Sequence, residues 1–119
     1  MRMWKVDPKV LCVHHLLGEH KELHMLVGTL NKGIIDIVNS KFVTQGLIEI
    51  HNIKNRHDEI VTELLNRGYP SGLNHKTPIN NGDFKSIVAG NINIEENLKE
   101  LSRRCKNCKE RIKNDFILS

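Results

Sequence analysis

The sequence predicts an all-α fold, and three observations indicate it. Apolar residues recur at intervals of three and four, the spacing of one helix face, in three long segments, residues 8–30, 53–67 and 94–116. Residues that favour helix ends, such as Asp7, Gly68 and Asn93, stand at the borders of these segments. A chain of 119 residues is long enough for one modest core. We therefore expect one small single-domain helical bundle over residues 1–119, with an extended N-terminal segment and one long loop.

The first helix is predicted from about Pro8 to Leu30. Asp7 is a favourable N-cap, and proline is well tolerated at the first helical position. The apolar face of this helix consists of Leu16, Leu23, Val27 and Leu30. The sequence Asn31-Lys32-Gly33 then predicts the end of the helix, with glycine as the left-handed cap. The mixed segment from Ile34 to Gln45 allows a short helix that Gly46 closes.

The second long helix is predicted from the stripe of Ile53, Ile60 and Leu64, and it should end at Arg67 with Gly68 as its cap. Glu59, Glu63 and Arg67 are spaced as an i, i+4 ladder, which we assign to a solvated face.

A long connection is predicted from Tyr69 to Asn93, because this stretch holds all of Pro70, Gly72, Pro78, Gly82 and Gly90. Long loops of this kind are often functional. Three of its residues are suited either to contact with nucleic acid or to a plain surface loop: His75, Lys76 and Thr77.

The last helix is predicted from about Ile94 to Phe116, with Asn93 as its cap. Its apolar seam consists of Ile94, Leu98, Leu101, Cys105, Cys108 and Ile112. Its other faces carry the basic residues Arg103, Arg104, Lys106, Lys109, Arg111 and Lys113. This cluster is the strongest electrostatic candidate for contact with phosphates, and the alternative is an ordinary solvated face.

Charge and hydropathy narrow the class of protein. The net charge of +4 and the pI near 9.1 suit a phosphate backbone without requiring one. No apolar run approaches the roughly 20 residues of a membrane span. Lys5, Asp7 and Lys9 interrupt any early apolar region, so no signal peptide is predicted. We expect an intracellular, cytoplasmic protein without a membrane partner.

The cysteines and histidines leave several interpretations open. Cys105-x-x-Cys108 with Cys12 and nearby histidines is compatible with a zinc site, with a reduced core or with a redox pair. The cysteines fall on predicted apolar faces, which favours a core without metal. His20 and His24 have an i, i+4 spacing that can hold a metal ion, but the intervening glutamate is misplaced for a zincin motif. We expect no cofactor and no metal.

The segment HHLLGEHKELHM (residues 14–25) is the most informative part of the chain. His15, Glu19 and Glu22 follow each other at i, i+4 and i+7, so they share one stripe at the edge of the apolar face. A carboxylate there is partly desolvated, which raises its pKa and suits proton transfer near neutral pH. The alternative is a surface helix with solvated charges.

The N-terminus is the second half of this candidate site. If residues 1–7 are extended, they span about 20 Å, which is about the rise of a helix from Pro8 to Glu22. A chain that folds back along its first helix therefore brings the α-amine of Met1 close to Glu22. An α-amine has a pKa of about 8, so part of it is nucleophilic at neutral pH and can form a Schiff base with a sugar carbon.

Two blocks of this sequence resemble the phage pyrimidine-dimer DNA glycosylases, also called phage endonuclease V. The first is HLLGEHKEL (residues 15–23), and the second is Arg56 followed by EIVTELLNRGY (residues 59–69). The resemblance implies a phage-encoded base-excision repair enzyme that acts on damaged double-stranded DNA as a glycosylase and AP lyase. Protein partners are not indicated.

The resemblance also implies roles for single residues. The amine of Met1 matches the family's nucleophile and Glu22 its catalytic acid, and Glu22 lies 21 residues after Met1, as in the family. Arg2 matches a DNA-contacting arginine and His15 an active-site histidine; Lys21, Arg56, Arg103 and Arg104 complete the expected DNA-binding set.

Several positions depart from the family. The bulky Arg2 should keep Met1 in place, whereas the prototype loses its initiator methionine. Lys21 and Met25 stand where the family has arginines, and the aromatic C-terminal segment is not recognisable. These departures keep a second interpretation open, a non-catalytic phage protein that binds nucleic acid or nucleotides on the same scaffold. A further alternative is a small zinc-stabilised regulator.

Overall fold

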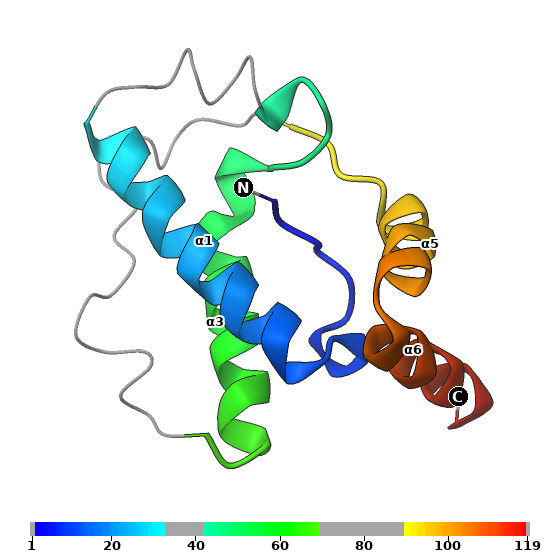
Figure 1. Cartoon of the computed structure of the whole chain (residues 1–119). Coiled ribbons are helices and arrows are strands. Elements are labelled where there is room, and N and C mark those ends of the chain that lie inside the picture. The colour runs from blue at the N-terminus through cyan, green and yellow to red at the C-terminus, as the bar shows by residue number, and fades with distance from the viewer. Residues whose placement is uncertain (1, 33–41, 70–89, 119) are drawn as a thin grey trace.

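The structure, a computed structural model, describes residues 2–32, 42–69 and 90–118 (Figure 1). These residues form four α-helices and two 3-10 turns: η1 (Pro8–Val10), α1 (Val13–Asn31), η3 (Ile50–Asn52), α3 (Ile53–Asn66), α5 (Ile94–Arg104) and α6 (Lys106–Leu118). No strand occurs in these ranges, and the predicted all-α fold is confirmed. Among the described helices, none combines the length and the apolar character needed to span a bilayer.

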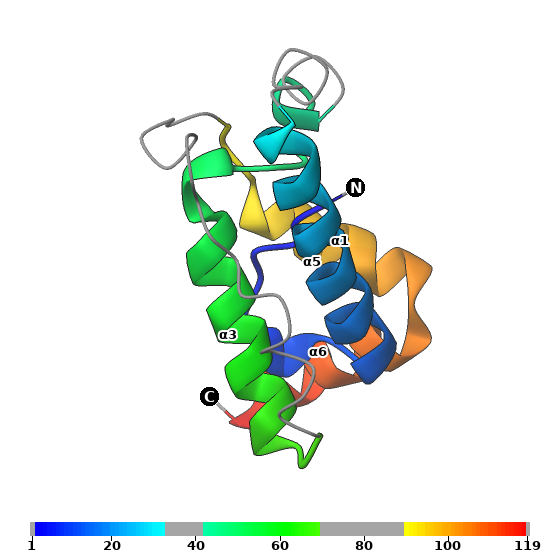
Figure 2. The same cartoon turned by 90° about the vertical axis from the view of Figure 1, so that its left-hand side faces the viewer.

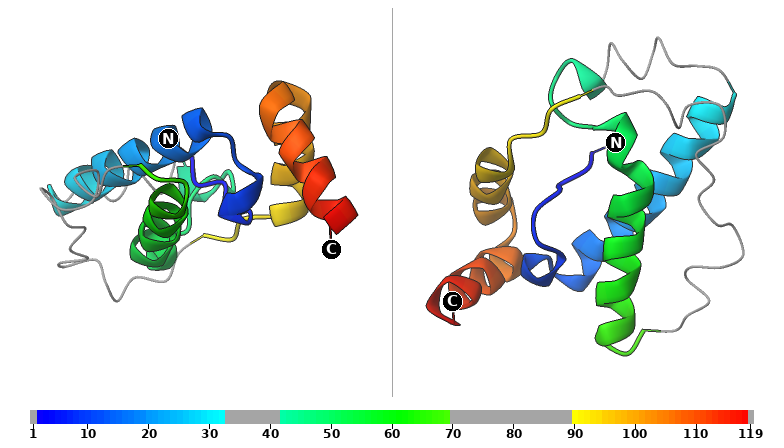
Figure 3. Two further views of the ribbon diagram at one scale, coloured as in Figure 1. Left: turned by 90° about the horizontal axis from the view of Figure 1, so that it is seen from below. Right: turned by 180° about the vertical axis from the view of Figure 1, so that it is seen from behind.

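The helices form two pairs with the N-terminal segment between them. α1 and α3 pack against each other and run in roughly opposite directions (Figure 2). α5 and α6 form the second pair, and residues 2–7 run as an extended segment between the pairs in each view (Figures 1 and 3). The extended N-terminal segment expected from the sequence is therefore present.

Hydrogen bonds from three different elements hold this segment in place. The amide of Met3 donates to the Leu47 carbonyl at 2.8 Å, and the Asn97 side chain of α5 donates to the Trp4 carbonyl at 2.7 Å. Arg56 of α3 donates to the Val6 carbonyl at 2.5 Å. The apolar side chains of the segment are almost fully buried, with exposed fractions of 1% for Met3, 6% for Trp4 and 1% for Val6. Met3, Trp4 and Val6 are thus part of the core.

The first helix begins later than the sequence predicts. Asp7 and Pro8 do start a turn, in which the Asp7 side chain accepts from the Lys9 amide at 3.0 Å, but this turn is the short 3-10 helix η1. Leu11 and Cys12 then adopt extended backbone angles, and α1 begins at Val13. This break lets Leu11 and Cys12 enter the core, where Leu11 has no exposed surface. Burial has overridden the local capping signal.

The second long helix agrees with the prediction, except for the ladder on its surface. α3 ends at Asn66, and Gly68 adopts a φ of +90°, the left-handed conformation expected of a helix cap. The pair Arg67–Glu63, at 2.9 Å, is largely buried rather than solvated. Arg67 also donates to the Leu11 carbonyl at 2.8 Å and to the carbonyls of Pro8 and Lys9 at 3.3 Å each. Arg67 therefore links η1 and the residue after it to the end of α3.

The last helix is two helices rather than one. The Asn93 side chain caps α5 by accepting from the Glu96 amide at 3.1 Å, as predicted. At Cys105 the backbone becomes extended, with φ −132° and ψ 112°, and α6 starts in a new direction (Figure 1). The predicted seam is buried at Leu101 and Cys108, but Ile94 is 41% exposed.

Other predicted features lie wholly or partly outside the described residues. They are the Gly33 cap, most of the short helix before Gly46, and most of the long connection, with His75, Lys76 and Thr77. Gly46 itself is described and has a φ of +72°, which a terminating glycine can adopt without strain.

Candidate active site

The backbone of the N-terminal segment contacts Glu22. The amide nitrogen of Arg2 donates to Oε2 of Glu22 at 3.3 Å. Glu22 is half-buried on α1, three residues after the fully enclosed Glu19. Met1 lies outside the described residues. The expectation that the start of the chain reaches Glu22 is therefore met as far as Arg2.

A pocket of about 220 Å³ opens beside this contact. Its lining combines cationic, aromatic and acidic side chains from the N-terminal segment, α1 and α5: Arg2, Trp4, His14, His15, Gly18, Glu19, Glu22 and Arg104. A side-chain methyl group at Gly18 would meet no neighbouring atom within 4 Å, so the floor of the pocket is open there. The pocket thus places a carboxylate next to cationic groups, an arrangement suited to an anionic ligand that undergoes proton transfer.

Arg2 is held at one wall of the pocket. Its guanidinium stacks 4.0 Å above the Trp4 ring, and its Nη2 donates to Oδ1 of Asn97 at 2.6 Å. Burial, with a further contribution from Arg104, lowers the pKa of Arg2, while Glu100 opposes that effect. The Nε of Arg2 is buried and has no acceptor in the described structure. This unused donor is available to an anion if the side chain turns toward the pocket.

Glu19 forms the floor of the site through a buried ion pair. Its two oxygens accept from Nε and Nη2 of Arg56 at 2.6 and 3.1 Å, and both side chains are at most 1% exposed. Burial raises the pKa of Glu19, and the bonds to Arg56 oppose that rise.

This pair removes Arg56 from the DNA-binding set that the sequence suggested. Its Nη1 donates to the Val6 carbonyl at 2.5 Å and to Glu59 at 3.4 Å, so the guanidinium is enclosed and holds α1, α3 and the N-terminal segment together. Arg56 is a structural residue and has no exposed donor for DNA.

His15 lies between the pocket and a group of cysteines. Its ring stands edge-on to Trp4, with centroids 5.8 Å apart. Its Nδ1 lies 3.2 Å from Sγ of Cys12 and 3.4 Å from Sγ of Cys108. Burial, followed by the charges of His14 and Arg104, lowers the pKa of His15, and Glu22 opposes this effect. The neutral imidazole is therefore favoured at neutral pH.

The basic residues of α5 and α6 are exposed, as predicted. Arg104 reaches the pocket, and both it and Arg103 bind Glu100. Hydrogen bonds from these arginines lower the pKa of Glu100 to about 2, so it is ionised and neutralises part of their charge. Lys21 is exposed on α1 next to Glu22, whereas Arg111 donates back to the Lys9 carbonyl at 2.9 Å. The predicted DNA-binding residues Arg2, His15 and Arg104 therefore meet at the pocket, and Lys21 and Arg103 lie on exposed helix surface.

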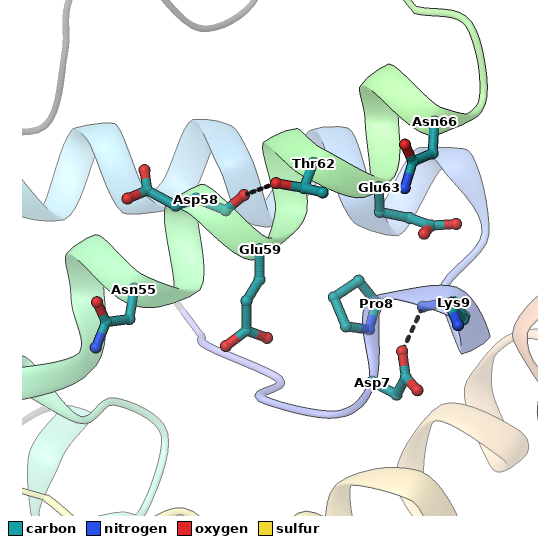
Figure 4. A pocket seen from close by; sticks show the side chains of 9 residues that line it. All are labelled: Asp7, Pro8, Lys9, Asn55, Asp58, Glu59, Thr62, Glu63 and Asn66. Carbon is teal, nitrogen blue, oxygen red and sulfur yellow. Dashed lines mark hydrogen bonds between the residues drawn. The ribbon is translucent and has the colours of Figure 1, made fainter.

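A larger hollow, of about 600 Å³, lies between η1 and α3 (Figure 4). Four of its nine lining residues are acidic: Asp7, Asp58, Glu59 and Glu63. Two of the hydrogen bonds here are local, from Lys9 to Asp7 and from Thr62 to the Asp58 carbonyl. Negative charge of this density repels a phosphate backbone. This hollow is therefore a poor candidate for the DNA-binding site, although it is larger than the pocket beside Glu22.

Sequence reasoning missed two residues of the candidate site. Trp4 supplies the ring under Arg2, and Asn97 binds both the Arg2 side chain and the Trp4 carbonyl. Asn97 lies 95 residues after Arg2 and is buried on a helix whose other polar residues are largely exposed. A polar residue at an apolar position of the α5 stripe was the available signal.

The fold and the site define a small helical protein in which the Arg2 amide contacts the Glu22 carboxylate beside a pocket lined by arginine, histidine and glutamate side chains. Residues 1–77 match the family model described as pyrimidine dimer DNA glycosylase, so the chain belongs to the pyrimidine dimer DNA glycosylase family. This membership assigns DNA glycosylase function in the repair of pyrimidine dimers, and hence damaged DNA as the partner. No curated protein and no solved structure matches the chain.

Proposed function

We propose that this protein is a DNA glycosylase with coupled AP lyase activity, in which the α-amine of Met1 is the nucleophile and Glu22 the acid–base group. The observation that carries the proposal is the 3.3 Å hydrogen bond from the Arg2 amide to the Glu22 carboxylate. The α-amine of Met1 is three covalent bonds away from that amide nitrogen, whatever the conformation of Met1. The bond therefore confines the amine to the surroundings of this one acid.

The reaction begins when a damaged nucleotide is opened into the pocket. The unprotonated amine of Met1 attacks C1′ of the deoxyribose, the glycosidic bond breaks, and its electron pair leaves with the base. One amine proton passes to the ring oxygen as the C1′–O4′ bond breaks, and a protonated imine forms between the Met1 nitrogen and C1′. Glu22 stabilises the positive charge that develops at the sugar.

Strand cleavage follows from the same intermediate. The Glu22 carboxylate accepts the C2′ proton, the electron pair moves toward the imine, and the C3′–O bond breaks with the phosphate as leaving group. Water then hydrolyses the imine and regenerates the amine. All groups in this cycle belong to the chain or the substrate, so the cycle needs no cofactor.

The cationic residues around the pocket position the substrate. Arg2 and Arg104 lie at its walls and are placed to hold the phosphates that flank the opened nucleotide. His15 shares the pocket with Glu22 and orients the sugar. Lys21 and Arg103, both exposed, extend the contact along the backbone.

Borohydride trapping tests the mechanism. Sodium borohydride reduces an imine to a stable amine, so we expect a covalent protein–DNA adduct on a duplex that contains one abasic site. An ultraviolet-damaged and an undamaged duplex are tested beside it, and peptide mapping of the adduct should locate the link at Met1.

Two matched variants make the test specific. Gly-Ser added before Met1 displaces the amine and should abolish the adduct, whereas the same residues added after Ser119 should leave it unchanged. A protein that binds the duplexes and yields no adduct would be a non-catalytic DNA-binding member of the family. Failure to bind any of the duplexes would contradict both the glycosylase proposal and the alternative of a non-catalytic DNA-binding protein.

A further inference from the structure

Four potential metal ligands converge where α1 begins and where α5 meets α6. We name this group the Cys3His cluster: Cys12, His15, Cys105 and Cys108. Cys12 precedes α1 and His15 lies in its first turn, while Cys105 ends α5 and Cys108 lies in the first turn of α6. Cys12 lies 93 residues before Cys105 and 96 before Cys108. Each half has two ligands separated by two residues, the close local spacing typical of structural zinc sites.

The distances in the cluster fit a tetrahedron around one ion. Zinc–sulfur and zinc–nitrogen bonds of about 2.3 and 2.05 Å place sulfurs about 3.8 Å apart and a sulfur about 3.6 Å from a nitrogen. Sγ of Cys12 lies 3.8 Å from Sγ of Cys105, and Nδ1 of His15 lies 3.2 and 3.4 Å from the sulfurs of Cys12 and Cys108. All four ligand atoms lie within 4.8 Å of one another.

The surroundings of the cluster suit thiolate ligands. Backbone amides donate to two of the sulfurs, from Cys12 to Sγ of Cys108 at 3.2 Å and from Cys108 to Sγ of Cys105 at 3.4 Å. Such donors stabilise negative charge on sulfur and orient the ligands around a metal. Cys12 and Cys108 are 7% and 0% exposed, while His15 and Cys105 are partly buried. Four protein ligands and low exposure are features of a structural site rather than of a catalytic one.

The cluster also accounts for the break between α5 and α6. No proline or glycine lies near Cys105, and the apolar seam predicts a continuous helix through it. In a continuous helix, Cys105 and Cys108 lie on successive turns of one face. The extended residue at Cys105 instead lets both sulfurs approach the start of α1. The backbone thus departs from a regular helix at a metal-ligand position.

We propose that the Cys3His cluster binds one zinc ion in a closed tetrahedral site, and that this ion fastens the α5–α6 junction to the start of α1. Three thiols release their protons to solvent on binding, and the neutral His15 coordinates through Nδ1. His15 also lines the pocket that holds Glu22, so the ion fixes one wall of the candidate active site. This proposal does not depend on the imine mechanism.

Two other arrangements of these residues fit the geometry less well. A disulfide between Cys12 and Cys105 requires sulfurs about 2.05 Å apart, and they are 3.8 Å apart. The second group of histidines, His20, His24 and His57, also brings three possible ligands together. There, however, two ring nitrogens are 3.1 Å apart and bind each other, and no thiolate contributes.

Metal analysis of the whole purified chain tests the proposal. We expect one zinc per chain by mass spectrometry and protection of all three thiols from Ellman's reagent until a chelator is added. Removal of the metal should lower the Tm by roughly 10 °C. A zinc-free protein whose thiols react at once, or an intact mass that shows a disulfide, would overturn it.

Substitution and cobalt spectra locate the ion. Cys105→Ser with Cys108→Ser should abolish zinc binding, and His14→Gln, next to the ligand His15, should retain it. Since serine variants can fail to fold, a second variant, His15→Cys, tests independently whether residue 15 is a metal ligand. It should still bind one ion, and its Co²⁺ form should gain thiolate-to-cobalt absorption over wild type. Zinc retained by the double serine variant, or a cobalt spectrum without thiolate bands, would contradict the assignment.

Discussion

Glu19 and Glu22 lie three residues apart on α1, share one helical stripe, and have opposite surroundings. Glu19 is enclosed by Arg56, which binds both of its oxygens. Glu22 is half-buried at a pocket, where it accepts one long hydrogen bond from the Arg2 amide. The first carboxylate has its hydrogen-bonding capacity committed to the fold, whereas the second keeps capacity free for a substrate. The role of an acidic residue is therefore not determined by its position on a helix face. It is determined by the partners that other elements of the fold supply.

The largest effect expected is on the activity of Glu22→Gln. Glutamine keeps the shape of the side chain but cannot accept the C2′ proton, so strand cleavage at an abasic site should fall about 10²- to 10⁴-fold. Single-turnover nicking of an abasic duplex measures this. Glu95→Gln, an exposed glutamate at the start of α5, is the control and should cleave at the wild-type rate.

Stability provides the other half of this test. Glu22→Gln should unfold at nearly the same temperature as wild type, because its partner is one backbone amide. Wild-type cleavage by Glu22→Gln would show that the two acids do not differ in the way the structure indicates, and that another group accepts the proton.

The next effect is on the stability of Glu19→Gln. Removing one member of a buried ion pair leaves the other uncompensated, which costs about 3–5 kcal/mol. Urea denaturation should therefore show a much lower free energy of unfolding. Glu59→Gln is the control, because Glu59 is 56% exposed in its 3.4 Å pair with the same Arg56 and its loss should cost at most about 1 kcal/mol. Equal losses in the two variants would contradict the structural role of Glu19.

Replacement of both partners should have a smaller effect than the loss of one. A buried ion pair can often be exchanged for apolar residues of similar volume at little cost. Glu19→Leu with Arg56→Met should thus recover most of the stability that Glu19→Gln loses. Recovery should stop short of wild type by about 1–3 kcal/mol, because the Val6 carbonyl loses its donor. A double variant less stable than Glu19→Gln, again by urea denaturation, would show that the pair is needed for the packing of α1 on α3.

The sequence was sufficient to predict the parts of this site that depend on backbone geometry alone. Helix rise and the reach of an extended segment are nearly constant, and counting residues on this basis predicted that the N-terminal segment approaches Glu22. The count assumed one helix from Pro8, whereas the structure has η1, two extended residues and α1 from Val13, so it gave the direction of the segment but not the path of the chain. The helix of residues 53–66 followed from its apolar spacing, and the same spacing predicted the helical character of residues 94–116 but not the break at Cys105.

The parts that depend on long-range pairing were not predictable. Arg56 and Glu19 are 37 residues apart, and nothing local distinguishes a buried arginine from a DNA-binding one. The break at Cys105 was missed for the same reason, since Cys105 contacts Cys12, which lies 93 residues earlier in the chain. Arg67 was assigned to a solvated face because the carbonyls of η1 that it binds carry no sequence signal. In each case the local sequence allowed two conformations or two environments of similar energy, and tertiary contacts determined which one forms.

The smallest effect expected concerns His20, which follows Glu19 and points to the same interior as Leu23. Burial, and then His57 and His24, lower its pKa from 6.5 to about 4. Between those values the unfolded chain binds more protons than the folded one, so stability is complete above pH 6.5 and is lost as the pH falls toward 4. His24, whose pKa is also lowered, adds to the same dependence of stability on pH.

Since Nε2 of His20 has no partner to lose, His20→Leu should match wild type at pH 8 and lose less stability at pH 5. Thermal denaturation of both proteins across this range measures the difference, and parallel curves would show that His20 is not kept neutral by the interior that also encloses Glu19.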